Sequence, residues 1–322
     1  MLILEKFSGE IPDTNALHWN LKEFNDDDGE TVLMCGYDTT QEKSFHDSTE
    51  AYKRKILFNN WSPCEFSSLK DHFGLNAFQY DQRFNEVYTI CPYTAEWMNS
   101  MYGHEKYKSI FYPFNKNIIP KNQEKIYDVI YHGGIHGQDH VDCLKSMSKF
   151  NYLYLTMTHH INQMTINCLP YATTVNVPFQ EKIDFVAQSR VSVSYNLLYD
   201  VERHINAIQT YNSWEQNKAH GEVGKQNIRP QFKTRMHEGA ISKTLNVVKR
   251  DPWNLAELYY EPEKEFLYFD THKELELIIE DAKNNWDKYE PIVERAYRRA
   301  MNYTTDKFVD VVKSGQSWEG YE

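Results

Sequence analysis

Cysteine is scarce and scattered in this chain of 322 residues. The number of cysteines is odd, and no two of them form a Cys-x-x-Cys pair. A disulfide framework or a zinc ribbon needs paired, closely spaced cysteines, so both are disfavoured and we expect reduced thiols, as in a cytosol-like compartment. The five cysteines are Cys35, Cys64, Cys91, Cys143 and Cys168.

Long apolar runs are also absent. No run approaches the roughly 20 residues that a transmembrane helix needs. The opening Met-Leu-Ile-Leu-Glu-Lys-Phe lacks the longer apolar core of a secretory signal peptide. We therefore expect a cytoplasmic protein with no membrane span, in the host cytoplasm if the source is a virus.

Positive charge is deficient, with 35 Lys and Arg against 46 Asp and Glu and a net charge of -11. An acidic surface does not by itself attract nucleic acid or an anionic membrane. The segment from Lys218 to Arg250 is an exception, because Glu222 and Glu238 are its only acids among many bases. Such a segment indicates an anionic ligand, or else a solvated loop whose cations pair with acids elsewhere.

Apolar residues make up 41% of the chain and aromatic residues 15%, which is enough for one large domain or two of average size. Short apolar runs alternate with helical patterns, which predicts an α/β fold with parallel sheets covered by helices on both faces. Strands are expected at 31–36, 55–60, 86–92, 107–113, 126–131, 152–157, 191–195, 245–248 and 266–269. Helices are expected from Thr94, the predicted N-cap, and over 141–149, 184–189 and 238–243.

The last part of the chain predicts helices. Apolar residues recur at three- and four-residue steps over 273–301, where Pro291 is expected to kink or split the helix, and a short helix follows over 305–313. Residues 115–124 are the best linker candidate. We expect one domain over 1–120, a second over 121–300, and a terminal segment, 301–322, whose helix returns to the first domain.

A glycine pair, Gly133 and Gly134, follows a predicted strand and precedes a predicted helix. Glycines at such a turn let backbone amides approach a phosphate closely, although a tight strand–helix turn needs no ligand. The pattern matches neither G-x-G-x-x-G nor a Walker loop. Within this loop, His136 is a candidate to contact a phosphate or a reacting sugar.

A second cluster lies downstream, where Arg229, Lys233 and Arg235 precede Glu238 at the predicted start of a helix. Cations suit phosphates and a carboxylate suits ribose hydroxyls, so the cluster predicts a site for a nucleoside diphosphate. The alternatives are a carboxylate that only stabilises the helix dipole and cations that are only surface charges. If the cluster binds a ligand, it should converge with the glycine pair in one crevice.

The histidines do not predict a metal site. His132, His136 and His140 recur every four residues, but the intervening glycines make a continuous helix across them improbable. Asp38 and Glu65 could face the crevice or cap helices, so we assign no general base.

Two passages resemble a known family. Arg235-Met-His-Glu238-Gly-Ala-Ile-Ser-Lys-Thr-Leu-Asn-Val resembles the Arg-x-Phe-Glu-Ala-x-Ala-x-Gly segment of GT-B glycosyltransferases of the spore-maturation-protein type, within the broad group-one glycosyltransferases. Tyr260-Glu-Pro-Glu-Lys-Glu265, with Tyr268-Phe269 and His272-Lys-Glu-Leu275, resembles their Pro-Gly-Lys-Glu and Glu-Glu-Leu passage, and the terminal helix with Tyr303-Thr304-Thr305 resembles their ending. The resemblance covers roughly residues 126–312 and is weak in the first 120.

The resemblance implies two Rossmann-like domains facing a cleft, an acceptor-side domain first and a nucleotide-sugar-binding domain second. It implies that Glu238 holds the ribose, that Lys233 or Arg235 neutralises the diphosphate leaving group, and that Asn196 occupies a position where the family often has asparagine. The expected co-substrate is a nucleotide sugar such as a UDP-sugar, with no cofactor and no metal. Two departures stand out, because Lys243 replaces a usual glycine and Pro230 a glutamate of retaining relatives.

Three functions fit these features. The first is a glycosyltransferase acting on a glycan or a lipid-linked acceptor. The second is a viral enzyme that glycosylates a modified DNA base, which the Asn-, Lys- and Tyr-rich composition suggests and the acidic net charge disfavours. The third is a non-catalytic GT-B protein that binds a sugar or nucleotide. Retention or inversion at the anomeric carbon stays open.

Overall fold

The computed structural model describes a large part of the chain, and the described residues divide into two compact units. The first unit contains the described residues up to Lys116, together with Ile228, Arg229 and those from Tyr303 onward; the second contains the described residues over 117–199 and 230–302. The described residues are 1–5, 20–35, 49–59, 83–90, 92–103, 105–121, 124–134, 138–156, 174–175, 177–199, 228–230 and 232–321.

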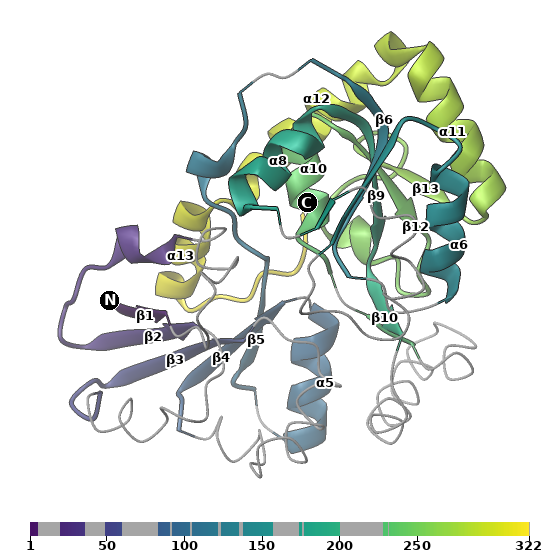
Figure 1. The fold of residues 1–322 in the computed structure, drawn as a ribbon. Coiled ribbons are helices and arrows are strands. Elements are labelled where there is room, and N and C mark those ends of the chain that lie inside the picture. The colour runs from purple at the N-terminus through teal and green to yellow at the C-terminus, as the bar shows by residue number, and fades with distance from the viewer. Residues whose placement is uncertain are drawn as a thin grey trace. The chain divides into compact units, whose positions relative to one another are not determined.

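The first unit is built on a parallel sheet, which has five strands in the described residues, in the order β1-β2-β3-β4-β5 (Figure 1). The side chains of Leu33, Ile56 and Leu57 are fully buried, as expected for a parallel sheet covered on both faces. The strands are β1 (Leu2–Glu5), β2 (Thr31–Cys35), β3 (Arg54–Asn59), β4 (Glu86–Ile90) and β5 (Tyr107–Ile110). The helices are η1 (Leu21–Phe24), α5 (Pro92–Tyr102) and α13 (Thr305–Ser314), and η2 (Lys116–Ile118) and η9 (Met301–Tyr303) lie where the two units join along the chain.

The terminal helix α13 packs on the sheet of the first unit. The ring of Phe308 meets that of Phe58 on β3 edge to face, with 4.7 Å between centroids, and Tyr303 and Trp318 contact Phe111 after β5. Phe114 and Thr304 form a parallel β-bridge. Residues from both ends of the chain therefore share one hydrophobic core.

The second unit contains a parallel sheet in the order β13-β12-β9-β6-β7-β8. Helices α6 and α11 cover one face of this sheet, and α8 packs on the other (Figure 1). The strands are β6 (Tyr127–His132), β7 (Tyr152–Thr156), β8 (Thr174–Val175), β9 (Ser189–Tyr195), β10 (Leu197–Tyr199), β12 (Leu245–Lys249) and β13 (Leu267–Phe269), and the short strand β11 (Ile228–Pro230) lies at the boundary between the two units along the chain. The helices are α6 (Gln138–Met147), α8 (Phe179–Ala187), α10 (Arg235–Ile241), η7 (Leu255–Leu258), α11 (His272–Asn284), η8 (Trp286–Lys288) and α12 (Glu290–Ala300).

The predicted α/β architecture with parallel sheets is confirmed, and most predicted strands lie within a residue or two of the observed ones. The predicted long helix is split, and Pro291 lies in the first turn of α12, where its missing N–H has no cost. Four predicted helix starts are wrong. Helices α6 and α10 each begin three residues earlier than predicted, at Gln138 and Arg235. Helix α5 begins at Pro92, so Thr94 is inside it, and α8 begins at Phe179 after Pro178 rather than at 184.

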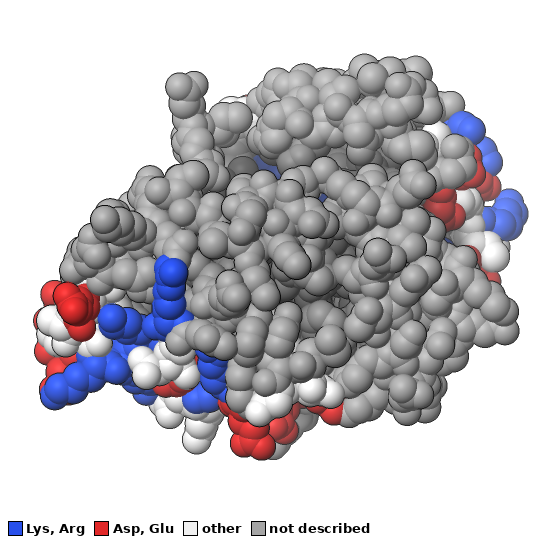
Figure 2. Space-filling view, turned by 90° about the horizontal axis from the view of Figure 1, so that it is seen from below, with Lys and Arg blue, Asp and Glu red and all other residues white. Residues whose placement is uncertain are grey.

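Charged residues at the amino ends of β3, β4 and β5 hold the terminal helix. Glu86 accepts hydrogen bonds from Arg54 and Lys108. Arg54 also donates to the carbonyls of Val312 (2.9 Å) and Lys313 (3.1 Å), where α13 ends. At the lower left of Figure 2, Lys and Arg side chains form a group on the surface, with Asp and Glu side chains beside it. Because Glu86 binds two cations that also reach α13 and its following turn, it links the sheet to the end of the chain.

Replacing Glu86 should make the stability of the first unit depend less on pH. Burial opposes ionisation of Glu86, but the hydrogen bonds from Arg54 and Lys108 outweigh it and lower its pKa. A carboxyl with a lowered folded-state pKa contributes stability above its unfolded pKa of about 4.3, and the contribution is lost as pH falls through the folded pKa. Glu86→Gln should therefore destabilise the protein at pH 7 by about 1 kcal/mol, allowing for solvent screening.

Urea unfolding of wild type and variant across a pH series measures this difference. It should be constant above about pH 5 and shrink below about pH 4. Glu50→Gln, at an exposed position in the same unit, is the control and should show no such difference. A Glu86→Gln effect of equal size at pH 3 and pH 7 would contradict the assigned role.

Candidate functional site

The order of strands in the second unit creates a topological switch point between β6 and β9. The chain leaves β6 toward β7 and β8 on one side, then returns to place β9 on the other side of β6. In open parallel sheets, ligands bind at the carboxyl ends of the strands where the order reverses. His132 ends β6 and Asn196 follows β9, so both lie at this point.

The turn after β6 lies directly against the guanidinium group of Arg235. Gly133 has φ of +128°, and a Cβ built there would be 2.2 Å from Nη2 of Arg235. Arg235 donates from Nη1 to the Tyr131 hydroxyl at 2.9 Å, and its Cζ is 4.9 Å from the centroid of the Tyr131 ring. The Tyr131 hydroxyl in turn donates to the carbonyl of Gly134 at 3.2 Å. The glycine is thus needed both for its backbone conformation and for the space that the cation fills.

Glu238, in the first turn of α10, is 1% exposed and joins three elements. Lys182 of α8 donates to Oε1 at 2.8 Å, and Nδ1 of His132 lies 3.1 Å from Oε2. The hydroxyl of Thr234 donates to Oε1 at 3.3 Å. Burying a carboxylate is costly unless it is paired and hydrogen-bonded, and these three donors meet that requirement.

His132 is held in one tautomer by its two neighbours. Burial lowers its pKa below the usual value although Glu238 acts in the opposite direction, so the ring is neutral near pH 7. A carboxylate can only accept, which places the proton on Nδ1 and leaves Nε2 to accept from the hydroxyl of Ser192, 3.3 Å away on β9. His132 therefore connects Glu238 to the central strands of the sheet.

Helix α10 lies very close to β12. A Cβ on Gly239 would be 2.1 Å from Oδ1 of Asn246, whose Nδ2 donates to the carbonyl of Met236 at 2.8 Å. After the helix, Lys243 has φ of +50°, and the amides of Lys243 and Thr244 return to the carbonyls of Ala240 and Gly239. This is the Schellman arrangement, in which glycine is the usual residue at the left-handed position. Lys243, the departure noted in the sequence, thus keeps the backbone conformation that glycine would adopt.

The segment before α10 is fixed from two sides. Oδ1 of the buried Asn196 accepts the backbone N–H of Lys233 at 3.0 Å, which connects the end of β9 to the cationic segment. The ring of Phe232 stacks on that of Tyr259, with 3.7 Å between centroids. Nδ1 of His237 lies 2.7 Å from the Tyr260 hydroxyl. The position of Arg235 and Glu238 is therefore set by packing as well as by charge.

The charges around this switch point leave an excess of positive charge. Lys182 and Glu238 form an ion pair, and His132 is neutral near pH 7. Arg235 contacts Tyr131 and the glycine turn and forms no ion pair with an acid in the described part of the chain. An anion could bind such a site beside the cation.

The structure brings several of the predicted site residues together. Gly133, Gly134, Arg235 and Glu238 lie around one switch point, with Asn196 and Lys233 joined beside them. His136 lies outside the described residues. Arg229 is in β11, but its side chain is outside the described part.

Sequence reasoning did not assign Lys182, Tyr131 or Ser192 to the site. Lys182 belongs to the turn of α8 that the predicted helix start omitted, and Tyr131 and Ser192 resembled ordinary strand residues. A buried-strand pattern with a Tyr or Ser near its carboxyl end would have been the available signal.

Two further results concern the described residues alone. They contain no group of three or more His, Cys, Asp or Glu side chains arranged to hold a metal ion. None of their helices is long and apolar enough to cross a membrane.

Comparison with solved structures identifies the fold. HepE from Anabaena in complex with UDP-glucose has a TM-score of 0.58 and 11% identity over 88% of this chain and 79% of its own. TarM from S. aureus, in a complex that includes UDP, gives 0.57 and 11% over 88% of this chain and 55% of its own, so this chain spans about half of TarM. The pneumococcal O-GlcNAc transferase GtfA, with UDP and GlcNAc, gives 0.53 and 9% over 96% of this chain and 60% of its own.

No protein-family model and no curated protein sequence matches the chain. The structural neighbours are GT-B glycosyltransferases, and the two units with parallel sheets correspond to their architecture. The chain therefore has the α/β GT-B fold.

The close approach of Gly133 and Arg235 predicts the effect of a single methyl group. Gly133→Ala should destabilise the protein by about 1–3 kcal/mol from the disfavoured φ alone, and more because the guanidinium must leave Tyr131. Adding Arg235→Ala should remove the part of the destabilisation that comes from the clash with the guanidinium. The part that comes from the disfavoured φ should remain. Thermal or urea unfolding of the single and double variants measures both contributions.

Gly103 provides the control for this cycle. It has φ of +68°, and nothing lies within 4 Å of a Cβ built there. Gly103→Ala should therefore cost only about 1 kcal/mol. If Gly133→Ala cost no more than this and Arg235→Ala gave no recovery, the packing described for the turn would be wrong.

Proposed function

We propose that this chain is a glycosyltransferase that uses a nucleoside-diphosphate sugar as donor, bound by the second unit. The observation that carries the proposal is the position of Arg235 over the glycine turn, beside the buried carboxylate of Glu238, at the switch point of a GT-B sheet. The neighbours whose structures contain UDP or UDP-glucose support the choice of donor.

In this proposal, Arg235 binds the diphosphate. An arginine can donate two parallel hydrogen bonds to a phosphate, and its charge compensates the charge that develops as the phosphate leaves. Lys233 and Arg229 are proposed to assist it, Gly133 and Gly134 to let the backbone approach the phosphates, and His136 to lie near the reacting sugar. Because these cations stabilise the leaving group, the proposed reaction needs no metal ion.

Glu238 is proposed to bind the ribose. Its carboxylate contacts Lys182, His132 and Thr234 and is 1% exposed, so a ribose hydroxyl can reach it only by taking the place of a group that now covers it. The Thr234 hydroxyl is the partner at the longest distance, 3.3 Å, and a ribose hydroxyl offers the same kind of donor. We propose that the ribose displaces Thr234 and that Asn196 keeps the preceding segment in place.

The reaction transfers the sugar to a hydroxyl group of the acceptor. The bond between the anomeric carbon and the phosphate oxygen breaks with its electron pair going to the diphosphate, the acceptor oxygen forms the new bond to that carbon, and the proton of the acceptor hydroxyl is released in the end to solvent. The nucleoside diphosphate leaves against Arg235. We propose a glycan or a lipid-linked molecule as the acceptor, with the first unit on the acceptor side.

Titration of the protein with UDP-, GDP- and ADP-sugars by isothermal calorimetry tests the donor. At least one of them should bind, and Arg235→Gln should weaken binding about tenfold or more, because a charge-assisted hydrogen bond contributes about 1.5–3 kcal/mol. Lys273→Gln, which removes an exposed cation of α11, is the matched control and should bind like wild type. A folded protein that bound none of the three classes would refute the proposal.

Glu238→Ala should weaken donor binding by about 1.5–3 kcal/mol through the lost hydrogen bond to the ribose. It also removes the ion-pair partner of the partly exposed Lys182, so the variant must be tested for folding by circular dichroism. Comparison with a donor that has a 2′,3′-dideoxyribose separates the two effects. Wild type should lose affinity for the dideoxy donor, whereas Glu238→Ala should bind both donors alike; a further loss in the variant would contradict the ribose role.

A further inference from the structure

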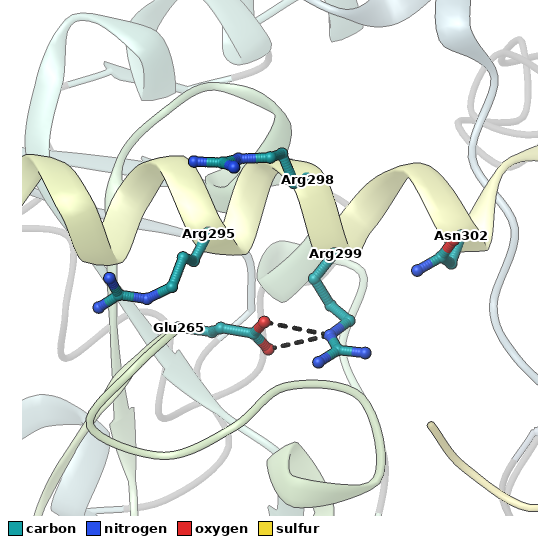
Figure 3. A pocket seen from close by; sticks show the side chains of 5 residues that line it. All are labelled: Glu265, Arg295, Arg298, Arg299 and Asn302. Carbon is teal, nitrogen blue, oxygen red and sulfur yellow. Dashed lines mark hydrogen bonds and ion pairs between the residues drawn. The ribbon is translucent and has the colours of Figure 1, made fainter. Parts of the chain in front are cut away.

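Helix α12 and the loop before β13 line a pocket of about 300 Å³. Its lining is Glu265, Arg295, Arg298, Arg299 and Asn302 (Figure 3). None of these residues contributes to the cluster around Glu238 and Arg235 described above. With three guanidinium groups and one carboxylate, the lining has an excess of positive charge.

The basic residues form one stripe on the helix surface. Arg298 and Arg299 follow Arg295 by three and four positions, and Asn302 continues the stripe into η9. Residues three and four apart lie on the same face of a helix, about 5–6 Å apart at Cβ. The spacing therefore places the Cβ atoms of the three arginines near one another on α12, while Figure 3 shows the guanidinium of Arg298 along the edge of the helix away from Glu265.

The loop holds two of these arginines. Nε of Arg299 lies 3.1 Å from both carboxylate oxygens of Glu265, which also accepts the backbone N–H of Glu261 at 2.8 Å. Nε of Arg295 donates to the carbonyl of Lys264 at 2.8 Å. Figure 3 shows Arg295 and Arg299 extending from α12 toward the Glu265 loop. Glu265 compensates Arg299, whereas a neutral carbonyl orients Arg295 without removing its charge.

Among the residues that the structure describes, the acid nearest to Nε of Arg298 is a distant one. Oε1 of Glu294 lies 3.8 Å away, and Oε2 of the same carboxylate is 2.9 Å from Lys243. One carboxylate therefore serves two cations. Arg298 is 70% exposed, so its guanidinium can adjust to a ligand.

Helix stability alone accounts for part of this arrangement. Cations in the last turn of a helix stabilise its dipole by about 0.3–1 kcal/mol, and Arg298 and Arg299 lie in the last turn of α12. The helix dipole does not explain Arg295, which lies one turn earlier. It also does not explain why acceptors of the loop orient the guanidinium groups of Arg295 and Arg299 at the pocket. We propose that this pocket binds a phosphate group with two negative charges, held by Arg295 and Arg298 beside the Arg299–Glu265 pair. Arginine suits this role because its planar group can donate two hydrogen bonds to one phosphate.

Calorimetric titration with inorganic phosphate and with α-glycerophosphate tests the site and distinguishes two sources of the anion. Binding of both would indicate a phosphate ester of a larger molecule as the natural ligand, and binding of inorganic phosphate alone would indicate the free anion. Diethyl phosphate, with one charge, should bind more weakly than either. Arg295→Gln and Arg298→Gln should each weaken binding about tenfold, and the double variant should abolish it.

The variants are chosen so that folding is preserved. Arg295 and Arg298 are exposed, whereas Arg299 is paired with the buried Glu265 and is left unchanged. Circular dichroism and the melting temperature should match wild type. Arg298→Lys keeps the charge without the planar fork and should bind with intermediate affinity, and Lys273→Gln is the control for the loss of a surface cation.

Arg235→Gln separates this site from the proposed donor site. It should leave phosphate binding at α12 intact while it weakens nucleotide-sugar binding. If the double variant bound phosphate as wild type does, or if wild type bound neither phosphate nor α-glycerophosphate, the α12 site would be refuted and the donor proposal would be unaffected. If phosphate binding were lost in Arg235→Gln and kept in the double variant, the phosphate site would belong to the switch point instead.

Discussion

The buried carboxylate of Glu238 is the interaction on which the arrangement of the candidate site depends. It connects α10 to α8 through Lys182 and to β6 through His132, and His132 carries the connection to Ser192 on β9. The carboxylate of Glu238 would be costly to leave alone in an interior that excludes water, so the four elements must be placed together. Because Glu238 must keep these partners, helix α10 is fixed relative to β6. The position of Arg235 beside the glycine turn is fixed with it.

The two glycines that flank this cluster serve close packing. At Gly133 the space of a side chain is filled by a guanidinium group, and at Gly239 it is filled by the amide of Asn246. Gly133 allows the guanidinium of Arg235 to lie against the turn after β6. Gly239 allows α10, the helix that contains Arg235, to pack closely on β12. A positive charge is thus held near a strand end by main-chain proximity, not by an acidic partner in the described part of the chain.

Much of the fold could be predicted from the sequence, because the buried strands of parallel sheets appear as continuous apolar runs. Residues 32–35 in β2 and 129–131 in β6 are examples. Helix starts were less predictable, since α5 begins at Pro92 although Thr94 was the expected N-cap, and α8 begins directly after Pro178 although 184 was the expected start. The short strand Leu2–Glu5 was missed because four residues are too few to show a strand pattern. They form a strand by pairing with β2.

The candidate site, like the fold, has features that the sequence predicted and features that it did not. The proximity of the Gly133 turn to Arg235 and Glu238 followed from the expectation that strand ends converge in an α/β sheet. The partners of Glu238 could not be foreseen, because Lys182 and His132 are 56 and 106 positions away and only the tertiary structure selects them. Lys243 had seemed a departure from the expected glycine, yet the hydrogen bonds of the helix end preserve the left-handed backbone without it.

The packing of α13 on the first sheet has a consequence for biosynthesis. Phe308 and Tyr303 complete a core whose strands are translated at the beginning of the chain. Domains usually fold in order as they leave the ribosome, at about 5–20 residues per second. Here the residues of the second unit emerge before the last helix does, so the sheet that is made first must wait for the residues from Tyr303 onward to close its interior.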